Sequence, residues 1–303
     1  MDYFLDRGLD GDLYSFRNAD DIRLRWRQMN YTYGLPSLFP TDEDYCMWNH
    51  KDLPNVGPIF YRDIVECIKL LLRHPPFMEH LIFALSQEYN ESSECVYSDL
   101  HTADGWWKIQ AMYLDGATII PVICASDESH LTNFSGDKSI WPLYMTIGNI
   151  PKDIRREKSS KAWICIGLLP TLKLDGVSSS QQWHSAVHHI LEPIRTRHCF
   201  DFPCSDGYIR QCYPILNGWV ANFPKQCTVA LVKRNRCPAC TVPTQCLGDP
   251  KPPHGFNLHD PQEYLSEPDA RDETTARARM EQDGVHSIDN LFLEYPACNP
   301  FTL

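Results

Sequence analysis

Three apolar runs lie close together in the middle of the sequence, at residues 118–125, 141–149 and 162–169. Each is about eight residues long, which is typical of a β-strand and short for a helix. The links between them are short, and the second, at 152–161, is charged. Because a parallel return needs roughly a dozen residues or more, these runs predict three neighbouring antiparallel strands.

The first run ends in an acidic tip, Ser126-Asp127-Glu128, and a turn through Ser135-Gly136-Asp137 follows. A carboxylate at the end of a central strand is well placed to bind a metal ion. Aspartate is also common in ordinary turns, where its side chain accepts hydrogen bonds from the backbone. The spacing alone leaves both interpretations open.

Other segments show helical or strand patterns. Residues 178–197 predict a helix with an apolar stripe formed by Trp183, Val187, Ile190 and Ile194. A strand is expected at 213–220, followed by a turn at Asn222-Phe223-Pro224 and a helix to Val232. Further expected helices cover 19–28, 58–73, 77–86, 103–113 and 261–283, with a brief strand at 96–97 and an otherwise irregular segment over 1–58.

Composition limits the function classes. The 303 residues are 43% hydrophobic, which is enough for a sizeable core in one large domain or two. The net charge of −11 argues against broad phosphate neutralisation, so a nucleic-acid contact would be local. The basic stretch Arg23–Gln28 suits either such a contact or a solvated helix face. No stretch has the length of a membrane span, and there is no secretion signal.

Cysteine and histidine spacing suggests one metal site. Without a secretion signal, the thirteen cysteines are expected to be reduced thiols. Cys237 and Cys240 form a CxxC pair that could hold a structural zinc ion, with His254 as a third ligand. A redox role would place this pair at a strand-to-helix turn. Cys246 and His259 are later candidates for the same site.

Two other polar features have simpler explanations. His184 and His188 are four residues apart on the expected helix, but the HExxH pattern of metalloproteases lacks its glutamate here. We therefore interpret them as surface or half-buried histidines. Asp206 precedes the strand at 213–220 and is a minor candidate for chemistry, although Asp206-Gly207 is more typical of a hairpin turn.

Several long segments, in order, resemble the Plavaka transposases, cut-and-paste transposases of fungal mobile elements related to the CACTA group. The matching segments are FRNADDI at 16–22, YRDIVECIKLLL at 61–72, ASD at 125–127, FSGDKSIWPLYMTIGNIPKDIRR at 134–156, YPILNGWVANFPKQ at 213–226 and KRNRCPAC at 233–240. The resemblance runs from about residue 15 to the end.

The resemblance implies an α/β (α+β) fold with an RNase H-like core, a mixed sheet and a set of three acidic residues that bind two Mg²⁺ or Mn²⁺ ions. Asp127 matches the first acid. The second is expected as Asp in a pattern resembling A-D-x-P, but this chain has Asn222 in Ala221-Asn222-Phe223-Pro224. The third lies downstream in a helical region, and we expect the chain to be cut short before it. Glu294 is in the wrong context for that role.

These departures predict a transposase-derived protein that does not cleave DNA, because Asn is a much weaker ligand than Asp for a hard cation. We expect a helical or irregular region at 1–115, a partial catalytic core at 116–235 and a CxxC insertion with a charged helix at 236–303. The resemblance implies terminal-repeat DNA as a partner, a homo-oligomer and a nuclear location. The alternative is a non-catalytic, zinc-stabilised module for DNA or protein binding.

Overall fold

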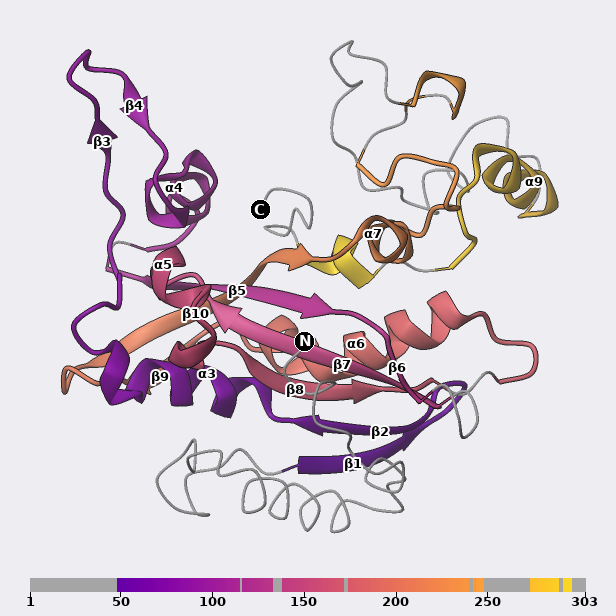
Figure 1. The fold of residues 1–303 in the computed structure, drawn as a ribbon, viewed down its shortest axis with the longest axis horizontal. Coiled ribbons are helices and arrows are strands. Elements are labelled where there is room, and N and C mark those ends of the chain that lie inside the picture. Colours follow the sequence, from indigo (N-terminus) through magenta and orange to yellow (C-terminus); the bar gives the residue numbers. More distant parts are fainter. Residues whose placement is uncertain are drawn as a thin grey trace.

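The computed structural model describes residues 48–114, 116–132, 138–171, 174–239, 242, 244–247, 273–288 and 291–295. A large sheet has the strand order β1-β2-β8-β7-β5-β10-β9, and β6 pairs with β7 (Figure 1). Its strands are β1 (Trp48–Leu53), β2 (Gly57–Arg62), β5 (Thr118–Ser126), β6 (Ser129–Thr132), β7 (Lys138–Ile147), β8 (Ile164–Leu169), β9 (Phe200–Pro203) and β10 (Ile209–Val220).

The helices are α3 (Ile64–Arg73), α4 (Asp104–Gln110), α5 (Lys152–Arg155), α6 (Ser179–Thr196), α7 (Phe223–Ala230) and α9 (Glu273–Asp283). Short 3-10 turns are η3 (Pro75–Phe77), η4 (Leu100–Thr102), η5 (Lys158–Ser160), η6 (Thr244–Cys246) and η7 (Leu291–Glu294). No helix in this described part of the chain combines the length and apolar character needed to cross a membrane.

The centre of the sheet confirms the predicted antiparallel trio. β7 pairs antiparallel with β5 on one side and with β8 on the other. β10 instead runs parallel to β5, from Cys212 opposite Thr118 to Val220 opposite Ala125. The long connection through α6 and β9 makes this parallel return possible. The result is a mixed sheet in an α+β fold of the RNase H-like type, as expected.

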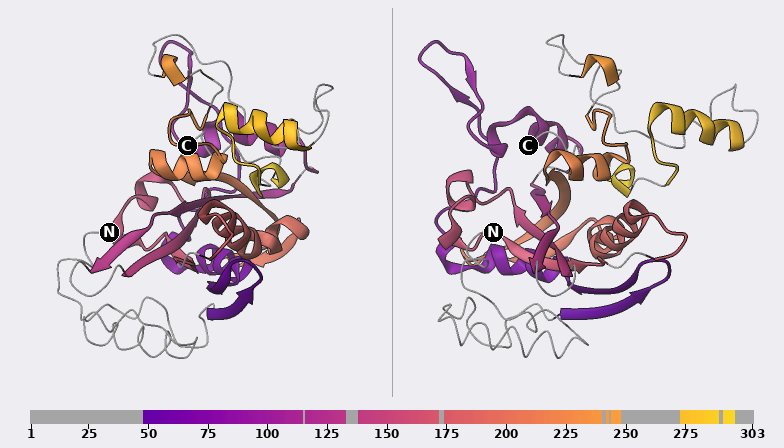
Figure 2. Two further views of the ribbon diagram at one scale, coloured as in Figure 1. Left: turned by 90° about the vertical axis from the view of Figure 1, so that its right-hand side faces the viewer. Right: turned by 45° about the vertical axis from the view of Figure 1, so that its right-hand side comes forward.

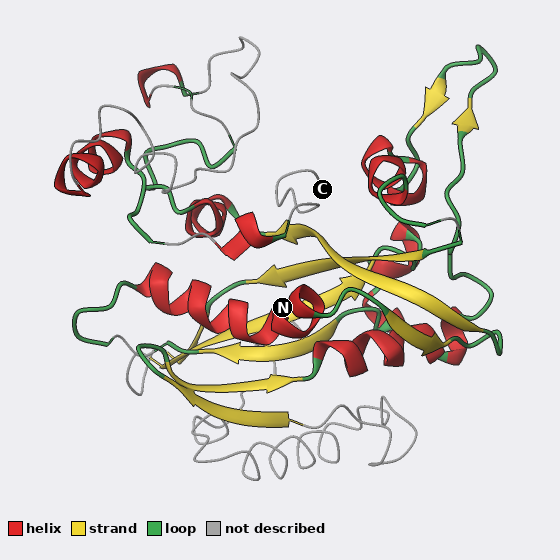
Figure 3. Ribbon diagram, turned by 180° about the vertical axis from the view of Figure 1, so that it is seen from behind, coloured by secondary structure: helices red, strands yellow, loops and turns green. Residues whose placement is uncertain are grey.

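Helices α3 and α6 cover the same face of the sheet (Figure 3). All four residues of the predicted α6 stripe are buried in the main core. Gly167 on β8 permits this close packing, because a Cβ atom there would come 2.7 Å from Cδ1 of Ile190. The prediction of a helix over 178–197 is therefore confirmed, and its apolar stripe is what holds it to the sheet.

The predicted helix from Pro58 is wrong over its first residues. Residues Gly57–Arg62 form β2, which pairs with β1 and with β8. The helix begins only at Ile64, where the Asp63 side chain accepts hydrogen bonds from the N–H groups of Val65 and Glu66. Ile59 and Tyr61 fit a strand period as well as a helix period, and pairing with β8 decided between them.

Two further expectations differ from the structure. Residues 48–58, predicted as irregular, contribute β1 and the start of β2. The helix expected at 77–86 does not form, and the 3-10 turn at Pro75–Phe77 includes only its first residue. The expected helix at 19–28, the basic stretch within it and most of the segment 261–283 lie outside the described residues, although α9 forms its last part.

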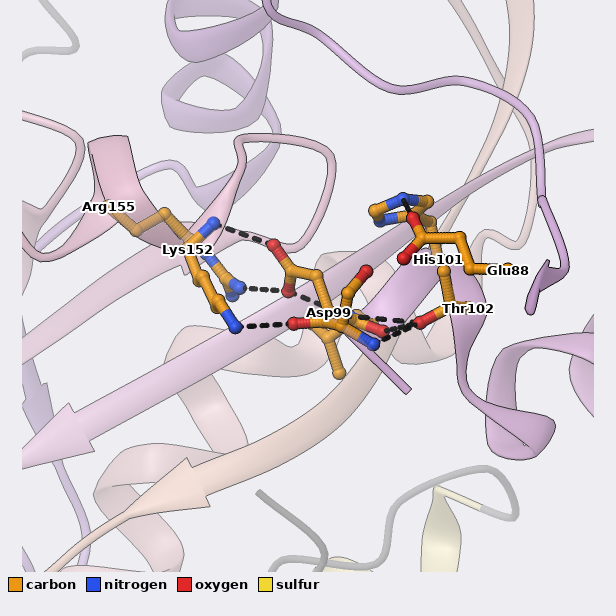
Figure 4. Close-up of polar contacts among 8 residues, drawn as sticks. Glu88, Asp99, His101, Thr102, Lys152 and Arg155 are labelled. Carbon is orange, nitrogen blue, oxygen red and sulfur yellow. Dashed lines mark hydrogen bonds and ion pairs between the residues drawn. The ribbon is translucent and has the colours of Figure 1, made fainter. Parts of the chain in front are cut away.

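A two-stranded sheet, β3 (Glu88–Tyr89) and β4 (Cys95–Val96), projects from the large sheet (Figures 1 and 2). Asp99 anchors the base of this arm (Figure 4). Its carboxylate accepts hydrogen bonds from the N–H of Lys152 at 2.6 Å and from Nη2 of Arg155 at 2.7 Å. The ion pair is largely buried, so it fixes α5 against the base of the arm.

Candidate functional site

The candidate site lies where β5 and β10 end. Asp127 follows β5 directly, and Asn222 lies two residues after β10. Because these neighbouring strands are parallel, their carboxyl ends meet at the same edge of the sheet, and β10 leads into α7 (Figure 1). Asn222 Nδ2 donates a hydrogen bond to Asp127 Oδ1 at 3.4 Å. The fold thus brings together two predicted site residues that are 95 positions apart.

Asn222 also caps α7. Its Oδ1 accepts a hydrogen bond from the N–H of Lys225 at 3.1 Å, and its backbone oxygen accepts from the N–H of Gln226. The cap engages the carbonyl side of the amide, so the NH₂ group faces Asp127. Asn222 therefore presents a hydrogen-bond donor, and not a ligand oxygen, to the carboxylate.

Lys225 supplies a positive charge at the acidic tip. Its Nζ lies 3.3 Å from Oε2 of Glu128 and 3.4 Å from the centre of the Trp141 ring. Burial lowers the pKa of Lys225, while Glu128 and Asp127 oppose that change by stabilising the ammonium. The proximity of Lys225 to Glu128 was not predicted, because it depends on where α7 starts relative to β5.

These residues do not fit a pair of divalent cations. A two-metal site needs several carboxylates that bridge or flank the ions. Here Asp127 faces an amide donor, and Glu128 is paired with an ammonium. Within the described ranges, no group of three or more His, Cys, Asp or Glu side chains is arranged to hold a metal ion.

The zinc prediction is untested. Cys237 is half-buried after α7, but Cys240 and His254 lie outside the described residues. The spacing did not suggest Cys227 on α7 as a neighbour of Cys237. Cys227 is buried, and Cys237 is close enough to influence the Cys227 thiol. Burial is the main reason why the pKa of Cys227 is raised, and the nearby Cys237 adds to it.

Asp206 is remote from the acidic tip. It lies in the turn between β9 and β10, at the opposite end of β10 from Asn222. Its carboxylate accepts two hydrogen bonds from Arg210, at 2.8 and 2.7 Å. The interpretation as a hairpin turn is confirmed, and Arg210 lowers the pKa of Asp206.

His184 and His188 do not form a metal pair. The ring of His184 is buried, and its Nε2–H donates to the Thr228 carbonyl at 2.9 Å, while Nδ1 accepts from the N–H of Leu291 at 3.4 Å. His188 Nε2 lies 3.3 Å from Oε2 of Glu294, which also pairs with Arg195. His188 is half-buried, as expected, but the expectation of a surface or half-buried position is wrong for His184, which is buried. Glu294 is engaged by His188 and Arg195 of α6.

Burial of His184 has a consequence for acid stability. Its pKa falls from 6.5 to about 4, chiefly because burial disfavours the charged ring, and nearby His286 adds to the effect. The folded state then binds fewer protons than the unfolded chain between these two values. The contribution of His184 to the free energy of unfolding is therefore full above pH 6.5. It falls by about 3 kcal/mol as the pH decreases towards 4.

Chemical denaturation at several pH values tests this prediction. The His184→Gln variant should show about 3 kcal/mol less acid loss than the parent between pH 7 and 4. The same substitution at His80 is the control, because it makes the same chemical change on an exposed side chain. Equal acid loss in the parent and in the His184 variant would contradict the assignment.

Comparison with known proteins places the chain in a family. A comparison with curated proteins gave no significant match. The profile described as Plavaka transposase matches residues 17–303, which is nearly the whole chain. The match includes the strand trio, α6, β10 and the acidic tip. This chain therefore belongs to the Plavaka transposase family.

Proposed function

We propose that this chain is a transposase-derived protein of a cut-and-paste element that interacts with DNA but does not cleave or join it. Family membership supports the DNA interaction. The observation that carries the loss of activity is the hydrogen bond from the Asn222 amide to Asp127. A neutral donor at that position removes a negative charge from the place where paired cations would need it.

The remaining features of the proposal follow from kinship. In intact relatives we expect metal-dependent strand transfer on terminal-repeat DNA, and we propose action in the nucleus as a multimer. A structural zinc ion bound by Cys237, Cys240 and His254 is part of the same proposal. The arrangement at Asp127 favours a non-catalytic role for this chain over an active one.

A nicking assay tests the proposed loss of activity. The full chain is incubated with a terminal-repeat DNA duplex and either Mg²⁺ or Mn²⁺, and strand breaks are resolved on a denaturing gel. We expect no cleavage above the background of a protein-free sample. Nicking that disappears in the Asp127→Ala variant would overturn the proposal.

Replacing Asn222 by Asp should make the stability of the chain depend on a bound cation. In the Asn222→Asp variant the cap of α7 is preserved, since Asp and Asn cap equally well. Its carboxylate would lie against that of Asp127, so the apo variant should melt at a lower temperature. Mn²⁺ at ten times its dissociation constant should raise the free energy of unfolding by about 1.4 kcal/mol.

Thermal melts with Mn²⁺ and with EDTA provide the measurement. The parent chain should show no Mn²⁺-dependent shift, because its acidic tip already holds an amide donor and an ammonium. The double variant Asp127→Asn, Asn222→Asp is the control and should lose the shift. An equal Mn²⁺ shift in the parent would show that Asn222 does not limit cation binding.

A further inference from the structure

A cavity of about 290 Å³ opens beside the acidic tip. Its walls come from the first turn of α6, from α7 and from the turn that follows α7. Glu128 and Lys225 belong both to this cavity and to the candidate site. Its volume is near the lower end of the roughly 300–1,000 Å³ range of small-ligand sites, so it is larger than one phosphate group needs.

The lining carries an excess of positive charge. Lys225, Lys233 and Arg234 line the cavity, and Glu128 is its one acidic lining residue among the described ones. Lys233 pairs with Glu281, outside the lining, whereas Arg234 is exposed and no ion pair joins it to a described residue. The positive charge of Arg234 also contributes to the lowered pKa of Lys225. The potential in the cavity therefore suits an anion.

The opposite wall adds hydrogen-bond donors. Ser179 and Ser180 begin α6, a helix of 18 residues, and both line the cavity. In the first turn of α6, the N–H of Gln181 donates to Ser178 Oγ, whereas the N–H groups of Ser179 and Ser180 have no acceptor within the helix. The positive end of the helix dipole is also there. Thr228 of α7 also lines the cavity, but its hydroxyl donates to the Pro224 carbonyl at 3.3 Å. Donors and cations thus approach the cavity from two separate elements.

The apolar part of the lining limits the kind of anion. Trp141 forms one wall, with Lys225 above its ring, and Pro224 and Val232 line the same cavity. A bare inorganic anion would use only the charged and polar part of this lining. A nucleotide unit combines an anionic phosphate with a sugar and base that can contact apolar groups, so it fits both parts of the lining.

We propose that this cavity binds one nucleotide of a DNA strand through its backbone phosphate, immediately beside Asp127. The inference rests on the proposed DNA interaction and names the place on this chain where the strand is held. The cavity reads no base sequence, because its polar groups are cations and hydroxyls suited to phosphate. The cavity would hold DNA without any metal ion. A chain with an inactive acidic tip would therefore still bind DNA there.

Binding of a fluorescein-labelled 20-nucleotide single strand tests the inference, measured by anisotropy with the full chain in EDTA. Arg234→Glu should weaken binding and reduce the slope of log K against log salt by about 0.7, the value for one lost phosphate contact. Ser180→Trp fills the cavity without a change in charge and should weaken binding roughly tenfold, a loss of about 1.4 kcal/mol. Circular dichroism confirms that each variant is folded.

Arg73→Glu provides a charge-matched control, because Arg73 is exposed at the end of α3 and does not line the cavity. Its binding should match the parent. If the parent binds and Arg234→Glu and Ser180→Trp bind equally well, the cavity assignment is wrong while the DNA interaction stands. If Arg73→Glu weakens binding as much as Arg234→Glu, net charge explains the effect and the cavity assignment also fails.

Two further outcomes distinguish a failure of the proposed DNA interaction from binding of free nucleotides. A parent chain that binds no DNA at low salt would overturn both this inference and the proposed DNA interaction. Displacement of the oligonucleotide by an equal concentration of dAMP would identify a site for free nucleotides and overturn the commitment to a DNA strand. We expect dAMP to compete weakly, because neighbouring phosphates of a strand add contacts that a mononucleotide lacks.

Discussion

Replacing Trp183 by alanine is expected to lower the free energy of unfolding by about 3–5 kcal/mol. Trp183 is fully buried on α6 and contacts the rings of Trp141, Trp219 and Phe292. These rings come from β7, β10 and η7. One side chain therefore joins the helix to two strands of the sheet and to the last described segment. Its loss leaves a cavity that rigid strands cannot fill.

Urea denaturation of purified chains provides the measurement. Trp107→Ala makes the same chemical change on α4, where the side chain is 39% exposed, and should cost less than about 1.5 kcal/mol. Trp183→Phe should be milder than Trp183→Ala, because most of the ring contacts remain. A loss at position 183 no larger than that at 107 would show that this cluster does not support the core.

Replacing Asp99 by alanine should be nearly as damaging, at about 3–5 kcal/mol, because it leaves a buried charge unpaired. The Arg155 guanidinium is only 11% exposed and pairs with Asp99. Burial lowers the pKa of Arg155, and Asp99 acts in the opposite direction by stabilising its charge. The N–H of Lys152 also loses its acceptor.

The adjacent pair Asp153–Arg156 is a matched control, since these side chains are 68% and 76% exposed. Asp153→Ala should change stability by less than about 1 kcal/mol, as expected for surface ion pairs. Hydrogen exchange on the Asp99→Ala variant should show faster exchange at Lys152 and in the arm. If the two alanine variants lose the same free energy of unfolding, burial of the Asp99–Arg155 pair does not affect stability.

The parts of the fold that local sequence patterns predicted are those with long, unambiguous periodicity. α6 was predictable because its stripe, from Trp183 to Ile194, repeats over about three turns and Ser178 caps the helix. The antiparallel trio was predictable because short links allow few other connections. β2 was not, because Ile59, Tyr61, Ile64 and Val65 satisfy a helical period and partly a strand period.

The candidate site likewise has residues that the sequence predicted and contacts that it did not. Asp127 stands out in the sequence because it ends an apolar run, and Asn222 because it departs from a family pattern. Nothing local indicates that Lys225 reaches Glu128, that Cys227 lies near Cys237 or that Arg234 lines a cavity with Ser180. Each of these proximities joins segments that are distant in sequence or depends on how a turn folds.

The sequence by itself determined the central strands, the long helix, the hairpin turn at Asp206 and family membership, because each depends on local periodicity, turn chemistry or matching segments in order. Only the tertiary structure decided what surrounds Asp127. The parallel register of β5 and β10 brings Asn222 to it, and the cap of α7 turns the amide's NH₂ group towards its carboxylate. Such contacts join residues about a hundred positions apart, and their geometry depends on strand order and register, which local patterns do not encode.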